Sequence, residues 1–153
     1  MKISRLIQLA LVSLAFPIVS HALPSGFIAE VVSDQNAITG VFAPNPRNDG
    51  KPMLLLVNRK GKVTILEDPD NSGDSIVILD LDGKLCNNGE RGAQTIVVHP
   101  DFSENGYVYL YYNKFKEGCP QSATDGSWNV ISRFAMDQDT LKLDYNTREE
   151  IWR

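Results

Sequence analysis

The sequence has little positive charge, little histidine and no long apolar run. Its 153 residues carry 15 Lys and Arg against 19 Asp and Glu, a formal charge of −4. Proteins that follow a phosphate backbone or an anionic membrane surface need a basic excess, so we expect no nucleic-acid partner. The longest apolar stretch, 6–19, is interrupted by Gln8, Ser13 and Pro17. It is too short to cross about 30 Å of hydrocarbon, and no membrane partner is expected for the mature chain.

The first 22 residues have the pattern of a secretory signal peptide. Lys2 and Arg5 precede the apolar stretch, which ends in the small-x-small sequence Ser20-His21-Ala22. We expect cleavage after Ala22, which leaves residues 23–153 as one mature domain. The protein is then predicted to be secreted and extracellular.

The chain has only two cysteines, Cys86 and Cys119. An oxidising compartment favours their pairing, so the sequence predicts one disulfide between them. A zinc site is disfavoured, because the mature chain offers these two separated thiols and a single histidine, His99, where zinc needs three or four ligands.

The rest of the chain has short apolar and alternating segments separated by Asp, Asn, Gly and Pro. Strands are predicted at 26–32, 53–58, 62–66, 75–81, 95–98, 107–112, 130–136 and, less distinctly, 149–152. The predicted fold class is all-β, and the spacing fits a sandwich, a barrel or a propeller. About eight strands make at most two four-stranded blades, so a propeller would be incomplete in this chain.

Three short motifs do not carry a catalytic or metal site. His99 follows an apolar strand and precedes a proline turn, so its ring is expected to hydrogen-bond the turn. Gly73-Asp74-Ser75 matches a lipase nucleophile block, but no Asp-x-x-His follows. The acidic turn 68–73 resembles the start of a calcium loop, yet its twelfth position is Leu79 where a glutamate belongs.

A longer pattern in residues 89–112 is more specific. Glu90-Arg91-Gly92, His99-Pro100-Asp101-Phe102 and Gly106-Tyr107-Val108-Tyr109 follow one another in that order. This series resembles the first signature block of the glucose/sorbosone dehydrogenase family, which comprises soluble quinoprotein-type sugar dehydrogenases. Segments 23–27, 58–63 and 130–134 extend the resemblance over nearly all of the mature chain.

The resemblance implies a six-bladed β-propeller of which this chain holds the N-terminal blades. Family members with activity bind pyrroloquinoline quinone (PQQ) over the central channel, with calcium nearby, and oxidise a sugar hydroxyl by hydride transfer. Glu90 corresponds to a position at the cofactor face where some enzymes have Gln, so Glu90 and Arg91 are the candidate cofactor-binding residues. Glu90 adds negative charge near a tricarboxylate. Arg91 either offsets this charge or forms an ion pair with Glu90 or a neighbouring loop.

The family's catalytic histidine lies in a His-x-Gly-Gly block that would come after Arg153. No catalytic or metal-binding residue is therefore predicted here, and neither PQQ nor calcium binding can be assigned to this chain alone. We expect no sugar oxidation from it. Three interpretations remain. The favoured one is the N-terminal part of a dehydrogenase-like propeller that acts on a sugar or another small molecule. The second is a secreted non-catalytic binding protein of the hedgehog-interacting type, with an extracellular protein partner, and the third is a short β protein that completes its sheets with another chain.

Overall fold

The computed structural model describes residues 24–48, 50–70, 75–116, 119 and 126–153. The chain divides into two compact units, Met1–Glu30 and Val31–Arg153. The predicted signal peptide, 1–22, lies outside the described residues, as do residues 71–74 of the acidic turn and the Gly73-Asp74-Ser75 motif. No helix among the described residues is long and apolar enough to cross a membrane.

The strand predicted at 26–32 is wrong. The described residues of the first unit are irregular, with a turn in which the Phe27 N–H donates to the Pro24 carbonyl at 3.1 Å. Residues 31 and 32, at the start of the second unit, also belong to no strand. Phe27, Ile28 and Val31 are 71%, 93% and 84% exposed. The apolar residues of 26–32 therefore form neither a strand nor part of the buried core of the described residues.

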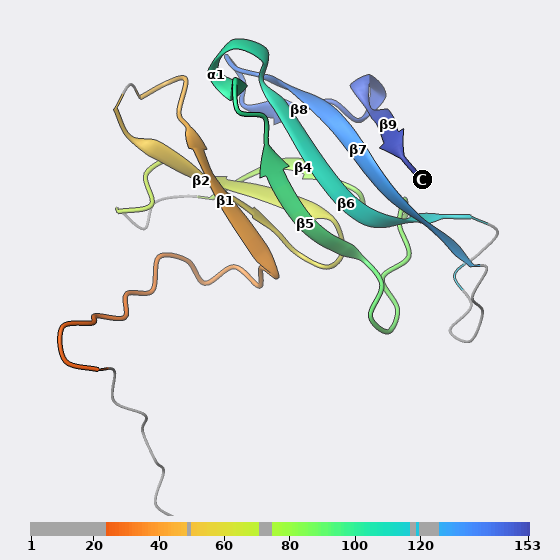
Figure 1. Cartoon of the computed structure of the whole chain (residues 1–153), viewed down its shortest axis with the longest axis horizontal. Coiled ribbons are helices and arrows are strands. Elements are labelled where there is room, and N and C mark those ends of the chain that lie inside the picture. Colours follow the sequence, from red (N-terminus) through yellow and green to blue (C-terminus); the bar gives the residue numbers. More distant parts are fainter. Residues whose placement is uncertain (1–23, 49, 71–74, 117–118, 120–125) are drawn as a thin grey trace, which may run out of the picture. The chain divides into compact units, whose positions relative to one another are not determined.

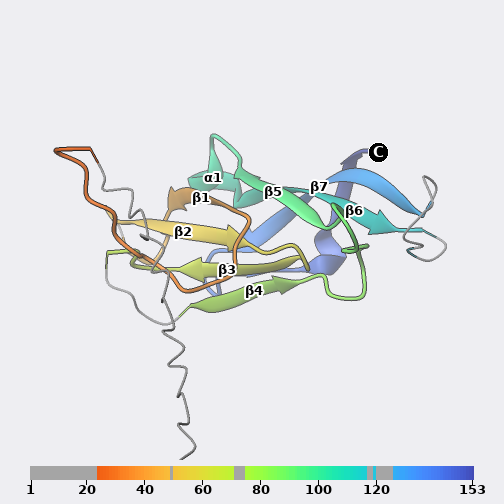
Figure 2. The ribbon, with the colours of Figure 1, turned by 90° about the horizontal axis from the view of Figure 1, so that it is seen from below.

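The first sheet has four antiparallel strands in the order of the chain. They are β1 (Thr39–Pro44), β2 (Pro52–Val57), β3 (Lys62–Leu66) and β4 (Ile76–Asp80). Figure 2 shows this succession within the sheet. The sequence predicted β2, β3, β4 and the turn between β2 and β3, but not β1.

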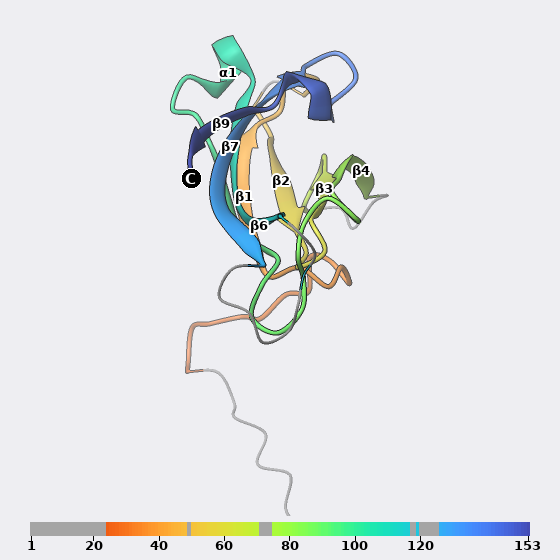
Figure 3. The same cartoon turned by 90° about the vertical axis from the view of Figure 1, so that its right-hand side faces the viewer.

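The second sheet repeats this meander. It contains β5 (Ala93–Val98), β6 (Tyr107–Phe115), β7 (Ser127–Asp137) and β9 (Glu149–Trp152), with β8 (Lys142–Leu143) paired to the last residues of β7. Figure 3 shows β9 alongside β7. The single turn α1 (Phe102–Asn105) joins β5 to β6, and the 3-10 turn η1 (Tyr145–Thr147) precedes β9. The all-β prediction is confirmed, and each sheet has the four-stranded antiparallel meander of a propeller blade.

One hydrophobic core lies between the two sheets. Leu55 and Ile65 of the first sheet belong to the same buried cluster as Ile96, Leu110 and Phe134 of the second. Along β6, Val108, Leu110 and Tyr112 are at most 1% exposed, whereas Tyr107, Tyr109 and Tyr111 are only half-buried. This strand therefore has one buried face and one half-buried face.

The connectivity gathers two loops at one end of the sheets. In two consecutive antiparallel meanders, the β2–β3 turn and the β4–β5 loop must lie at the same end, where β6 ends at Phe115 and β7 begins at Ser127. The Ala93 N–H donates to the Arg59 carbonyl across these two loops, at 2.9 Å. Figure 1 shows the turn after β2 and the loop before β5 toward the lower side of the view, opposite α1. We call this the Glu90 end, formed by residues 58–61, 81–92 and 119.

Candidate functional site

The loop that carries Glu90 and Arg91 is tied to β6 through the buried side chain of Asn113. The Gly92 N–H donates to the Asn113 side-chain oxygen at 2.9 Å, and the Asn113 N–H donates to the Gly92 carbonyl at 3.0 Å. The Asn113 amide also donates to the Asn129 side-chain oxygen on β7 at 2.5 Å. Asn113 is 9% exposed, so these bonds are protected from competing water. The loop therefore has a defined position at the start of β5.

Gly92 also fixes the loop against the β2–β3 turn. Its φ is +133°, and a Cβ atom added there would lie 2.4 Å from the Arg59 carbonyl oxygen. Only glycine allows this backbone conformation and this close approach. Gly92 is thus a site where a bare backbone meets another segment, and that segment is the turn at Arg59.

The Arg59 side chain connects the same turn to Glu90. Its Nη1 donates to the Gly89 carbonyl at 2.6 Å, and its Nη2 lies 3.8 Å from the Glu90 carboxylate. The Glu90 side chain is 99% exposed, so its ion pair with Arg59 contributes little to stability. The carboxylate therefore faces solvent at the Glu90 end with a guanidinium beside it.

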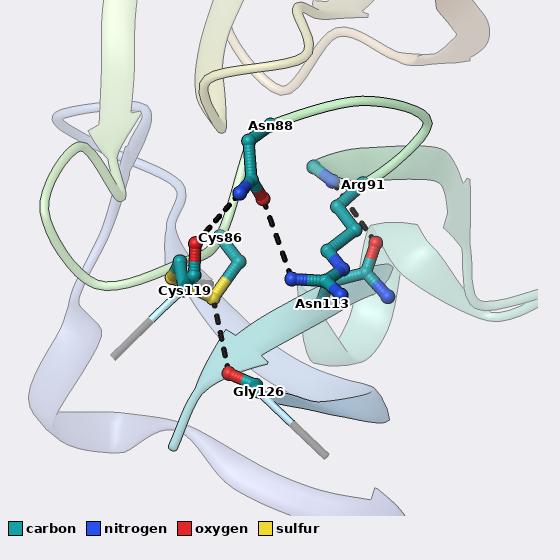
Figure 4. Close-up of a disulfide and its surroundings, with 7 residues drawn as sticks. Cys86, Asn88, Arg91, Asn113, Cys119 and Gly126 are labelled. Carbon is teal, nitrogen blue, oxygen red and sulfur yellow. Dashed lines mark hydrogen bonds between the residues drawn. A yellow bond between two sulfur atoms is a disulfide. The ribbon is translucent and has the colours of Figure 1, made fainter. Parts of the chain in front are cut away.

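Arg91 lies on the same loop and contacts its first residues. Its Nη1 donates to the Asn88 side-chain oxygen at 3.4 Å, and its backbone N–H donates to the Asn88 carbonyl at 3.2 Å. Figure 4 shows Arg91 and Asn88 on the loop above Asn113. The sequence left open whether Arg91 offsets the charge of Glu90 at a cofactor or forms an ion pair with Glu90 or a neighbouring loop. The structure places Arg91 against Asn88 and gives Glu90 an ion pair with Arg59.

The predicted disulfide between Cys86 and Cys119 is present, with Cα atoms 5.5 Å apart. It joins the β4–β5 loop to the β6–β7 connection. The Asn88 amide strengthens this link by donating to the Cys119 carbonyl at 2.6 Å (Figure 4). The Cys86 sulfur lies 3.4 Å from the Gly126 carbonyl oxygen, which is a contact without a proton because an oxidised sulfur has none to donate.

Tyr112 lies beneath the loop, opposite Ala93 in the strand register. Its hydroxyl is 3.2 Å from the Ser132 hydroxyl, and both residues are buried. Burial raises the pKa of Tyr112 above its ordinary value of 10.0, so the phenol stays neutral. Its role is to support the core below the Glu90 end.

His99 has the structural role that its sequence position predicts. Its Nδ1 atom is 3.0 Å from the Asp101 N–H and 2.9 Å from the Asn105 amide, and it accepts from both donors. The six residues of β5 separate His99 from Gly92, a distance of about 20 Å along a strand. His99 therefore lies at the opposite end of the sheet and cannot act on a molecule held beside Glu90.

The described residues contain no group of three or more His, Cys, Asp or Glu side chains able to hold a metal ion. The sequence also gave no indication that Arg59 and Asn113 position the candidate loop. In the sequence, Arg59 lies only in the short segment between the strands predicted at 53–58 and 62–66. Its contact with Gly89 spans 30 residues of chain, which local sequence patterns do not reveal.

Comparison with known proteins connects this geometry to a family. The model of the family described as Glucose / Sorbosone dehydrogenase matches residues 43–153. None of the curated proteins compared with the chain matches it.

Two solved structures, each named as a glucose dehydrogenase, share the fold. One is 21% identical with a TM-score of 0.57, covering 74% of this chain, and the other is 20% identical with a TM-score of 0.58, covering 78%. In both cases the chain spans about 30% of the length of the solved structure. These likenesses confirm that the two sheets are blades of a propeller of which this chain forms part.

Proposed function

Because this chain belongs to the glucose/sorbosone dehydrogenase family, we propose that it provides two N-terminal blades of a secreted quinoprotein-type sugar dehydrogenase and that its Glu90 end contributes to PQQ binding. The observation that carries the proposal is the positioning of the loop 89–92. Arg59, Asn113 and the Cys86–Cys119 disulfide hold this loop at the end of both sheets. Such a preorganised loop loses little conformational entropy when a ligand binds.

The residues at the Glu90 end fit one part of PQQ. PQQ carries three carboxylates, and a guanidinium recognises a carboxylate through paired N–H donors. Arg59 and Arg91 would hold one carboxylate, with Arg59 oriented by its bond to the Gly89 carbonyl. Glu90 opposes this attraction by its charge, although its oxygens still accept hydrogen bonds. When bound, PQQ supplies the hydride acceptor for oxidation of a sugar hydroxyl.

The chain's own residues bind and orient in this proposal, and none of the described residues is assigned as a general base. His99 is engaged in its turn at the far end of β5. The described residues also provide no calcium site. We therefore expect this chain alone to bind the quinone weakly and to oxidise no sugar.

The test is a titration of the oxidised chain with PQQ, followed by quenching of tryptophan fluorescence. Arg91→Gln should weaken binding by about tenfold, the effect of losing one charge-assisted contact. Glu90→Gln should strengthen binding a few-fold, because it removes the opposing charge while keeping an acceptor. Lys51→Gln is the matched control, because Lys51 pairs with Asp68 at the other end of the first sheet.

Unchanged binding in both Glu90→Gln and Arg91→Gln would exclude the Glu90 end from the cofactor site. Absence of saturable binding in the parent chain would favour the alternative of a secreted, non-catalytic protein-binding role. Dye-linked oxidation of glucose by the chain with PQQ and calcium would contradict the assignment of catalysis to residues outside it.

A further inference from the structure

A second polar site adjoins the loop 89–92 and shares Arg59 with it. It is an open pocket of about 450 Å³, lined by Asn36, Ile38, Asn58, Arg59, Lys60 and Asn87. Three segments form it: the approach to β1, the β2–β3 turn and the β4–β5 loop. The sequence analysis assigned no role to any of these side chains beyond the turn.

The pocket offers several hydrogen-bond donors that the fold does not use. Within the described part of the chain, the Lys60 ammonium and the side-chain amides of Asn36 and Asn87 make no hydrogen bond or ion pair. The Asn58 side-chain oxygen accepts the Lys62 N–H at 3.1 Å, which leaves its NH₂ group available. A lysine provides three donors and each amide NH₂ provides two.

The two cations of the pocket differ in how far they are neutralised. The Arg59 guanidinium is bound to the Gly89 carbonyl and lies 3.8 Å from Glu90. Lys60 has no such acid within the described residues. The pocket therefore presents about one unmatched positive charge together with amides that can donate to and accept from hydroxyl groups.

One wall of the pocket is apolar. Ile38 is 43% exposed, and its side chain provides a surface against which the C–H groups of a sugar ring can pack. The combination of one cation, three amides and one aliphatic side chain fits a ligand with a single anionic group, several hydroxyls and a ring. A simple inorganic anion would leave the amides and Ile38 unused.

We propose that this pocket binds a sugar acid. The carboxylate pairs with Lys60 and the adjacent Arg59, the ring hydroxyls exchange hydrogen bonds with Asn36, Asn58 and Asn87, and the ring lies on Ile38. This pocket shares Arg59 with the proposed quinone site, but the inference goes beyond that site because it uses neither Glu90 nor Arg91 and needs no cofactor.

The test is isothermal titration of the oxidised chain with glucuronate, without quinone and at physiological salt. Saturable binding is expected, with glucose at least about tenfold weaker because it lacks the carboxylate. Acetate should also bind at least about tenfold more weakly, since it lacks hydroxyls. Lys60→Gln should lower the affinity for glucuronate toward that for glucose, because Arg59 alone then pairs with the carboxylate, and should leave the affinity for glucose unchanged.

Two further variants separate the pocket from general surface charge. Lys51→Gln removes an equal charge from the other end of the first sheet and should leave glucuronate binding unchanged. Asn87→Ala should weaken glucuronate and glucose alike, because it removes a hydroxyl contact. Circular dichroism confirms that each variant is folded.

Equal affinity for glucuronate and glucose, parent-like binding by Lys60→Gln, or no saturable binding of glucuronate would each overturn the proposal. Acetate binding as tightly as glucuronate would reduce the pocket to a simple anion site and would also overturn it. The glucuronate titration contains no PQQ, so its result is independent of the quinone site. If glucuronate binds but the separate titration with PQQ fails, only the proposed function is refuted.

Discussion

Gly92 determines how closely the two blades approach each other at the Glu90 end. Its backbone lies against the Arg59 carbonyl, and its φ of +133° is in a region that side chains rarely adopt. A residue with a Cβ atom must separate the β2–β3 turn from the start of β5. The carbonyl of Arg59 would then lose its bond to the Ala93 N–H, and the candidate loop would move with it.

Gly92→Ala is therefore predicted to destabilise the chain by about 3 kcal/mol, from the strained backbone and the clash with the Arg59 carbonyl. Urea unfolding followed by fluorescence measures the change. Gly89→Ala is the matched control in the same loop, because Gly89 also has positive φ, +60°, but no atom lies within 4 Å of an added Cβ. It should cost only about 1 kcal/mol. Equal losses of stability in Gly92→Ala and Gly89→Ala would contradict a close contact between Gly92 and the Arg59 carbonyl.

At this scale, part of the site could be predicted from the sequence. The motif Glu90-Arg91-Gly92 indicated the candidate loop, and the lone His99 before Pro100 indicated a turn contact. Arg59 could not be predicted, because its role depends on which turn lies beside Gly92 after folding. Lys60 and Asn87 have no local pattern at all, and only the pocket brings them together.

The strands show which sequence patterns are sufficient to predict a strand. Strands β2 and β6 were predicted because one is apolar throughout and the other alternates, and both are flanked by turn residues. Strand β1 was missed because Thr39–Pro44 contains Gly40 and ends in proline. It forms because it pairs with β2 along its whole length, from Thr39 opposite Val57 to Pro44 opposite Pro52. Tertiary pairing thus outweighs weak local propensity.

The edge strand β9 is held by ion pairs as well as by its pairing with β7. Glu150 accepts a hydrogen bond from Lys114 of β6, and Arg148 lies 3.7 Å from the same carboxylate. The hydrogen bond from Lys114 lowers the pKa of Glu150 below its ordinary value of 4.5, and the charges of Lys114 and Arg148 add to this effect. A carboxyl group with a lowered pKa stabilises the folded state above its unfolded pKa, and this contribution is lost as pH falls through the folded pKa.

Glu150→Gln is predicted to reduce stability at pH 7 by no more than about 1 kcal/mol, because the pair is partly exposed. The difference in stability from the parent chain should shrink as pH falls below about 4.5. It should vanish once the Glu150 carboxyl is protonated in both the folded and the unfolded chain. Urea unfolding between pH 2 and pH 7 measures it. Glu149→Gln is the control, because the Glu149 side chain beside Arg133 is 59% exposed. This variant should lose less stability at pH 7. A loss from Glu150→Gln that is independent of pH would contradict the electrostatic explanation.

Over the whole molecule, two meanders share one core, while the outer face of each sheet remains partly open. Phe42 and Val77 of the first sheet are 60% and 40% exposed, and Val97 of the second is 48% exposed. In a propeller such faces pack against neighbouring blades, which agrees with a chain that spans about 30% of the glucose dehydrogenase structures it resembles. The sequence predicted the number of blades from the strand count. It could not predict which faces remain open, because this depends on the three-dimensional pairing.

A two-blade unit with open faces depends strongly on its single covalent link. The Cys86–Cys119 disulfide closes a separation of 33 residues, for which the chain-entropy model gives about 3 to 4 kcal/mol. That is a large share of the 5 to 15 kcal/mol of stability typical of a domain. We therefore expect the double variant Cys86→Ser/Cys119→Ser to lose about 3 kcal/mol in urea unfolding, with Gly126, Asn88 and the Glu90 loop less protected from hydrogen exchange.

The same link requires an oxidising compartment, so secretion and the disulfide are predicted together. The protein recovered from the culture medium of its source should begin at Leu23, after cleavage behind Ala22, and should take up no iodoacetamide at Cys86 or Cys119 before reduction. Reduction should expose both thiols and add about 2 Da to the mass. Peptide mapping with and without reductant measures both features. An alkylated Cys119 in the unreduced protein would refute the bridge, and a retained segment 1–22 would refute secretion by signal cleavage while leaving the fold of the blades unaffected.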